Sequence, residues 1–126
     1  MFLSEYLSDV TKTIDEYAKT SIILSSKVES DFRTERLGFI KGKIIFIDDS
    51  KLFFTEYLDL RYKIEKLTYS FHYQDKKANL IFRYDNAAHK PSQEFAEHKH
   101  VGDRISQSDV PELKCVLEEI IKEIEI

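Results

Sequence analysis

Histidines gather in the C-terminal third of this chain. Three of its four histidines, His89, His98 and His100, lie within residues 89–100. Histidine titrates near neutral pH, so one imidazole can accept a proton while another donates one. Metal-independent cleavage of RNA needs such a pair, and also a cation that stabilises the anionic transition state. The pattern therefore predicts an acid-base centre formed by these three side chains.

Neighbouring residues supply the other parts of such a centre. Asp85 could hold one imidazole in a chosen tautomer, as a carboxylate does in known acid-base pairs. If residues 98–100 are extended, His98 and His100 point to the same face, because side chains alternate along a strand. The residues that we expect to bind or orient the substrate are Arg83, Asn86, Lys99 and Arg104. Together these residues predict a working surface that begins where the last predicted strand ends.

Other interpretations of the same residues stay open. Glu56 lies in an alternating segment and could act as an additional base beside Asp85, although a strand glutamate usually lies on a solvated face. Asp85, Glu56 and the pair His98 and His100 could instead form a metal-dependent nuclease or phosphodiesterase. A single distant cysteine and one His-x-His pair match a structural zinc site poorly, so we expect no metal and no cofactor.

A non-enzymatic interpretation is also open. The histidines could be solvated or could bond to backbone carbonyls, and the chain would then be a protein-interaction module. An exposed edge of a sheet would give such a module, or a homodimer, a place to pair. Cleavage assays on RNA distinguish this class from the enzymatic one.

Length and composition limit the class of protein. The 126 residues, 42% of them hydrophobic, suit a single domain, residues 1–126, with one core. A net charge of -4 argues against a broadly basic surface that coats nucleic acid, and it leaves room for a local basic site. The only cysteine, Cys115, has no internal disulfide partner, and we expect it in the core. The chain shows no leader pattern and no long apolar run, so we expect a cytoplasmic protein.

Hydrophobic periodicity predicts an α+β fold. Helical spacing predicts an N-terminal helix over residues 2–18 and a C-terminal helix that begins near residues 108–109. Between them, five segments rich in β-branched and aromatic residues predict strands: residues 22–30, 37–47, 52–60, 64–73 and 79–84. Short connections demand antiparallel neighbours. We therefore expect a sheet of about five antiparallel strands, a long histidine-rich loop, and a C-terminal helix packed on the sheet.

Glycines interrupt the second of these predicted strands. Gly38 and Gly42 lack a Cβ, so they predict a bulge or a sharp bend within residues 37–47. A tight turn at residues 41–42, which would split the strand into two, is the alternative. Either arrangement would change which side chains share a face of the sheet.

Several segments of the chain occur in an order that resembles a known family. Residues 38–42, 52–57 and 66–73 precede an Arg-Tyr-Asp-Asn-x-x-His element at residues 83–89 and a His-Lys-His element at residues 98–100. This series covers most of the chain and resembles the TumE-type proteins, the toxin halves of prokaryotic toxin-antitoxin pairs. The resemblance implies a small protein that an antitoxin neutralises. The antitoxin in such pairs is often a DNA-binding helix-turn-helix protein. With the histidine chemistry, it predicts a toxin-like ribonuclease or RNA-binding inhibitor of translation.

Overall fold

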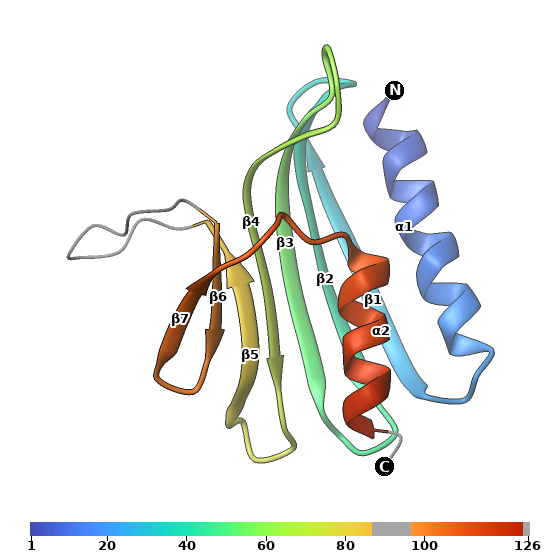
Figure 1. Ribbon diagram of the computed structural model, residues 1–126. Helices are drawn as coiled ribbons and strands as arrows, with labels where there is room; N and C mark the ends of the chain where they lie inside the picture. Colours follow the sequence, from blue (N-terminus) through green and yellow to red (C-terminus); the bar gives the residue numbers. More distant parts are fainter. Residues whose placement is uncertain (87–96, 125–126) are drawn as a thin grey trace.

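Seven strands form one antiparallel sheet in the part of the chain that the computed structural model describes, residues 1–86 and 97–124. Their order in the sheet is their order in the chain (Figure 1). The strands are β1 (Ile23–Phe32), β2 (Leu37–Phe46), β3 (Lys51–Asp59), β4 (Glu65–Gln74), β5 (Leu80–Asp85), β6 (His98–Val101) and β7 (Arg104–Gln107). The α+β class is confirmed, with two strands more than the sequence predicts.

Two helices, α1 (Leu3–Ala18) and α2 (Leu113–Ile124), cover the same face of this sheet (Figure 1). Their buried apolar residues join those of the strands in one hydrophobic core. No helix in the described residues has the length and apolar character needed to cross a membrane. We call the side of the sheet turned away from α1 and α2 the open face.

Strand β2 shows how the sequence assigns side chains to the two faces. Ile40, Ile44 and Phe46 are buried, whereas Lys41 and Lys43 are exposed. Successive side chains of a strand point to opposite sides of the sheet. The apolar set therefore packs beneath the helices, and both lysines lie on the open face.

The glycines of β2 do not break the strand, so the expected bulge, bend or turn is wrong. β2 pairs with β3 through Gly38 and Gly42 without a register shift. Instead, both glycines permit close packing: a Cβ on Gly42 would lie 2.2 Å from Cζ of Phe54, and one on Gly38 would lie 2.6 Å from the carbonyl oxygen of Asp31. Such contacts are too close for any larger residue without movement of the neighbours.

The segment between β5 and α2 contains a hairpin, so the expectation of one long irregular loop is partly wrong. β6 pairs with β7, and Val101 lies opposite Arg104 across a two-residue turn. Gly102 in that turn has φ +58°, a conformation that favours glycine, and glycine is preferred at the first position of a type II′ turn. Each strand is only four residues long, which is too short to give a clear alternating pattern.

Helix α2 begins later than the sequence predicts, and its cysteine is placed differently. Its first residue is Leu113, and two residues before it the carbonyl oxygen of Pro111 accepts a hydrogen bond from Lys66 Nζ at 2.6 Å. Cys115 is exposed, so the expectation that it lies in the core is wrong. The inward positions of the first turns are taken by Leu113, Val116 and Leu117.

Candidate functional site

Strand pairing brings the predicted acid-base residues to the open face. Asp85 lies opposite His98, and Arg83 lies opposite His100, across the pair of β5 and β6. Alternation along each strand then puts these four side chains on one side of the sheet, since each pair is two residues from the other. Arg83 also lies opposite His72 of β4, which extends the group toward the middle of the sheet.

The carboxylate of Asp85 lies between two imidazoles. Its Oδ1 is 3.5 Å from Nδ1 of His98, and its Oδ2 is 3.3 Å from Nε2 of His100. The side chains of Asp85 and His98 are 3% and 2% exposed, whereas that of His100 is 14% exposed. His100 is therefore the imidazole that solvent reaches more easily. Burial of this kind strengthens each electrostatic interaction within the group.

Arg83 connects this group to a second histidine. Its Nε donates to Oδ2 of Asp85 at 2.8 Å, and its Nη1 lies 3.2 Å from Nδ1 of His72. A guanidinium can only donate, so Nδ1 of His72 accepts and its Nε2 carries the proton. That Nε2 lies 3.0 Å from Oε1 of Gln74, which accepts it. Both ring nitrogens of His72 are therefore hydrogen-bonded to neighbouring side chains on the open face.

Contacts on the helix side hold β6 in place. Glu97, next to His98, accepts a hydrogen bond from the hydroxyl of Tyr69 on β4. Lys99 Nζ lies 3.0 Å from Oε2 of Glu119 on α2, and Tyr84 of β5 donates to the same carboxylate at 2.6 Å. Burial and the bond to Glu119 raise the pKa of Tyr84. Burial works to lower the pKa of Lys99, but the contacts with Tyr84 and Glu119 outweigh it and raise that pKa.

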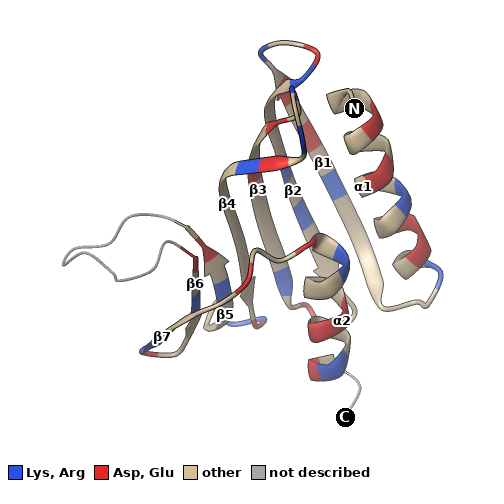
Figure 2. Ribbon diagram, turned by 45° about the horizontal axis from the view of Figure 1, so that its top comes forward, with Lys and Arg blue, Asp and Glu red and all other residues tan. Residues whose placement is uncertain are grey.

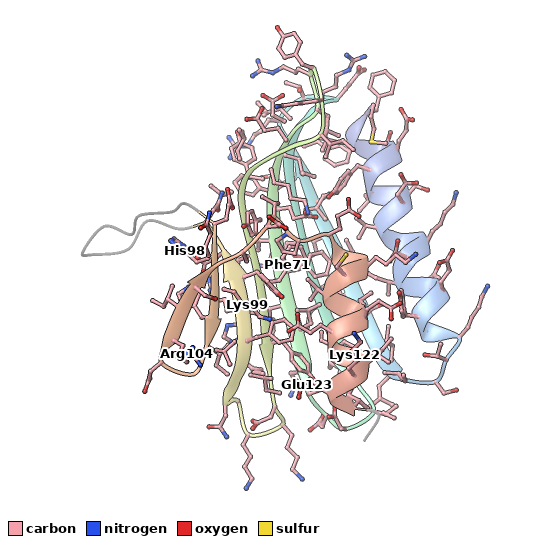
Figure 3. The ribbon with its side chains drawn as sticks, viewed as in Figure 1. Phe71, His98, Lys99, Arg104, Lys122 and Glu123 are labelled. Atoms are coloured by element: carbon pink, nitrogen blue, oxygen red, sulfur yellow. The ribbon has the colours of Figure 1, made fainter. Side chains whose placement is uncertain are left out.

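Two of the expected phosphate contacts lie away from the open face. Lys99 is adjacent to His98 and His100 in β6 and so points to the opposite side, where it binds Glu119. Arg104 lies opposite Val101, which is also on the helix side of the hairpin. Figure 3 labels His98, Lys99 and Arg104 on β6 and β7. Neither cation is positioned beside Asp85, because a strand alternates its side chains.

The other expected substrate residues have different outcomes. Asn86 uses its side-chain amide on β4: Oδ1 accepts from the backbone N–H of Tyr69 at 3.0 Å, and Nδ2 donates to the carbonyl oxygen of Leu67 at 3.1 Å. It extends the pairing of β4 with β5 and is not part of the group around Asp85. His89, which we expected as the third acid-base residue and not as a substrate contact, lies outside the described residues.

Glu56 lies on the other side of the sheet from Asp85, so the expectation of a shared site is wrong. It is 1% exposed, and its Oε2 lies 2.8 Å from Nζ of Lys66. The hydroxyl of Tyr6 on α1 donates to both of its carboxylate oxygens at 3.0 Å. Burial, followed by the charge of Glu56, raises the pKa of Tyr6. Glu56 therefore ties α1 to the sheet.

A groove of about 420 Å³ runs over the open face from β1 to β5 and ends at Arg83. The residues that line it are Lys27, Glu29, Lys41, Gly42, Lys43, Phe53, Phe54, Thr55, Ser70, His72, Gln74 and Arg83. Its lysines are not among the residues that the sequence predicts for the site. The alternation of Lys41 and Lys43 with buried residues could have placed both lysines on one face of the strand. It could not have shown that Lys27 of β1 lies beside them, because that depends on strand pairing.

One group among the described residues has the composition and spacing of a metal site. Asp85, His98 and His100 each offer one ligand atom, and these atoms lie within 4.8 Å of one another. Two imidazoles and a carboxylate suit zinc or manganese. However, the guanidinium of Arg83 occupies Oδ2 of Asp85 and opposes a cation there.

Comparisons with known proteins give a family and no closer relative. No curated protein and no solved structure matches the chain. A family described as Toxin TumE matches residues 11–126, which confirms the resemblance seen in the sequence. A toxin family of this kind implies a toxin-antitoxin partnership in general. Because the match extends over nearly all of its 126 residues, this chain belongs to the Toxin TumE family.

Proposed function

We propose that this toxin acts on RNA as a metal-independent ribonuclease, with Asp85, His98 and His100 as its acid-base centre. The observation that carries the proposal is the carboxylate of Asp85 between two imidazoles, at 3.5 Å and 3.3 Å, with Arg83 beside it. Two imidazoles and a fixed cation are the parts that metal-independent cleavage of a phosphodiester needs.

The proposed reaction is a transesterification within the RNA chain, and it needs no reactant besides the RNA. One imidazole takes the proton of a ribose 2′-hydroxyl, and the 2′-oxygen forms a bond to the adjacent phosphorus. The bond from phosphorus to the 5′-oxygen breaks, and the other imidazole gives that oxygen a proton. The products are a 2′,3′-cyclic phosphate and a 5′-hydroxyl. We assign the first step to His100 because its side chain is the more exposed, at 14% against 2% for His98.

Arg83 and Asp85 have separate roles in this reaction. The guanidinium stabilises the negative charge that develops on the phosphate oxygens. The carboxylate fixes the orientation of the imidazoles and stabilises the one that becomes protonated. Because Arg83 also contacts His72, its side chain is held between the groove and the acid-base centre.

The test is incubation of the purified protein with cellular RNA, with and without EDTA. We expect cleavage that EDTA does not reduce, with cyclic phosphate ends, and we expect His98→Ala/His100→Ala to remove it. Asp103→Asn, an exposed change in the β6–β7 turn, is the control and should cleave as the parent does. Cleavage by the double variant at the parental rate would overturn the proposal. Absence of cleavage in every sample would favour the interaction module.

A second candidate is a metal-dependent nuclease that uses the same three residues. The ligand atoms within 4.8 Å of one another favour it. In that case the purified protein holds stoichiometric zinc or manganese, and EDTA abolishes cleavage. The contact of Arg83 with Asp85 at 2.8 Å makes the metal-independent reaction our first choice.

The antitoxin would silence this site by covering the open face. We expect a DNA-binding helix-turn-helix protein in that role, as the family resemblance implies. Co-expression with the antitoxin should protect cellular RNA, and the purified complex should not cleave it. An antitoxin that binds but leaves the cleavage rate unchanged would place its contact elsewhere.

A further inference from the structure

We propose that the groove on the open face binds one unpaired strand of RNA and leads it to the acid-base centre. This inference rests on the proposed function, since it names the form of substrate that the centre receives. It concerns β1 to β5, and it uses residues outside the acid-base centre apart from Arg83, which belongs to both.

Pairing across the sheet arranges the side chains of the open face in two rows. The first row consists of Lys27, Lys43, Phe53, His72, Arg83 and His100, each opposite the next. The second row consists of Glu29, Lys41, Thr55, Ser70, Asp85 and His98. With about 4.8 Å between neighbouring strands, six strands extend over roughly 24 Å, which suffices for several nucleotides. Both rows end at the acid-base centre.

The groove is basic although the whole chain is acidic. Its lining contains four cations, Lys27, Lys41, Lys43 and Arg83, against one carboxylate, Glu29, whereas the net charge of the chain is -4. Glu29 lies 2.9 Å from Lys27 Nζ, so Lys41 and Lys43 are the cations most available to a ligand on this part of the sheet. Figure 2 shows that both β1 and β2 carry basic positions. The charge pattern matches a phosphodiester backbone.

An aromatic ring lies among these cations. Phe53 is 37% exposed, and Lys43 Nζ lies 5.6 Å from the centre of its ring. Phe39 and Tyr57 stack at 4.3 Å farther along the same face. A ring beside cations accepts a stacked base and its phosphate together. Bases inside a duplex are already stacked on each other, so this arrangement favours an unpaired strand.

Binding can be measured separately from cleavage. The probe is a fluorescently labelled twelve-nucleotide RNA with 2′-O-methyl groups, which lacks the 2′-hydroxyl that attacks phosphorus. Fluorescence anisotropy gives its Kd for the parent and for each variant, at several salt concentrations. We expect the parent to bind this strand at least tenfold more tightly than a duplex of the same length.

Matched variants test the two features of the groove. Lys41→Ala/Lys43→Ala should weaken binding at least tenfold and make the plot of log K against log salt shallower by about 1.4, from ~0.7 per phosphate contact. Lys12→Ala/Lys19→Ala, which removes the same charge from exposed positions at α1, should do neither. Phe53→Ala should weaken binding by a factor of between about 5 and about 150. Phe32 is 41% exposed on the helix side, so Phe32→Ala should leave RNA binding unchanged.

The outcomes separate this inference from the proposed function. Equal losses in the groove variants and their controls, or equal binding of duplex and single strand, would overturn the groove. The inference would also be overturned if an acidic polypeptide displaced the RNA from the groove and Phe53→Ala did not change RNA binding. That result would point to a protein ligand. If the strand binds through the groove while natural RNA stays intact, the groove stands and the proposed cleavage fails. If the groove variants cleave natural RNA at the parental rate, the proposed cleavage stands and the groove fails.

Discussion

Asp85 and His98 face each other across β5 and β6, with Oδ1 of the aspartate 3.5 Å from Nδ1 of the histidine. The two residues lie on separate strands, with residues 86–97 between them in the chain, so something other than adjacency in the sequence must place them together. The pairing register does so, and the contact of Glu97 with Tyr69 fixes where β6 begins. The candidate site is therefore a property of the sheet rather than of one segment.

Removal of the charge of Asp85 tests its role directly. Asp85→Asn keeps the shape of the side chain, but it can no longer stabilise a protonated imidazole. We expect the cleavage rate to fall by about 10²- to 10⁴-fold, the range of a general acid-base contribution. Binding of the 2′-O-methyl strand and the far-UV circular dichroism spectrum should change little. A parental cleavage rate in a folded Asp85→Asn protein would show that the carboxylate has no part in the reaction.

Arg83 and Lys99 lie on opposite faces of the sheet, so substituting each in turn tests which face carries the reaction. Arg83→Ala should lower the cleavage rate by about 10²- to 10³-fold, as the loss of a transition-state donor does. Lys99→Ala should leave that rate within a few-fold of the parent, because Lys99 binds Glu119 beneath α2. Its cost should appear in the free energy of unfolding, at roughly 1 kcal/mol. Similar rates for both variants would contradict the assignment of faces.

Glu56 should matter for folding and not for the reaction. Glu56→Gln leaves Lys66, whose side chain is 9% exposed, without its carboxylate. Loss of one partner of a buried ion pair costs about 3–5 kcal/mol, which denaturant unfolding would measure. Asp103→Asn should change the free energy of unfolding by less than about 0.5 kcal/mol. If Glu56→Gln abolished cleavage in a protein of unchanged stability, Glu56 would belong to the active centre after all.

Tyrosines with raised pKa values predict a loss of stability in alkali. Burial raises the pKa of Tyr6, Tyr69 and Tyr84, and it raises that of Tyr17 to about 12 together with a bond to Glu118. The folded protein therefore keeps these protons after the unfolded chain, with tyrosine pKa values near ~10, has lost them. Above that pH the unfolded state binds fewer protons, so the free energy of unfolding falls as pH rises.

Tyr6→Phe provides the control for this alkaline effect. One tyrosine contributes a slope of at most about 1.4 kcal/mol per pH unit. Denaturant unfolding between pH 9 and 11.5, followed by circular dichroism, should give a steeper decline for the parent than for the variant. The two proteins should show the same pH dependence below pH 9. Identical slopes above pH 10 would mean that Tyr6 titrates as an exposed tyrosine.

The sequence by itself determined the class of the fold and the outline of the site. Segments rich in β-branched and aromatic residues identified β1 to β5, and helical spacing identified α1, because both signals follow from local side-chain and backbone geometry. The same alternation put His98 and His100 on one side of β6. The clustering of histidines beside Asp85 pointed to the segment in which the structure brings Asp85, His98 and His100 together.

Only the tertiary structure decided which faces are shared and which are covered. Glu56 and Lys99 have side chains suited to the site, yet both point toward the helices. Lys41 and Lys43 lie on the open face, although the sequence did not predict them there. A shift of one residue in strand pairing would exchange the two faces, and the register is set by contacts distant in the chain. The helices bury whichever face offers the larger apolar surface, so the position of each charged side chain follows from that choice.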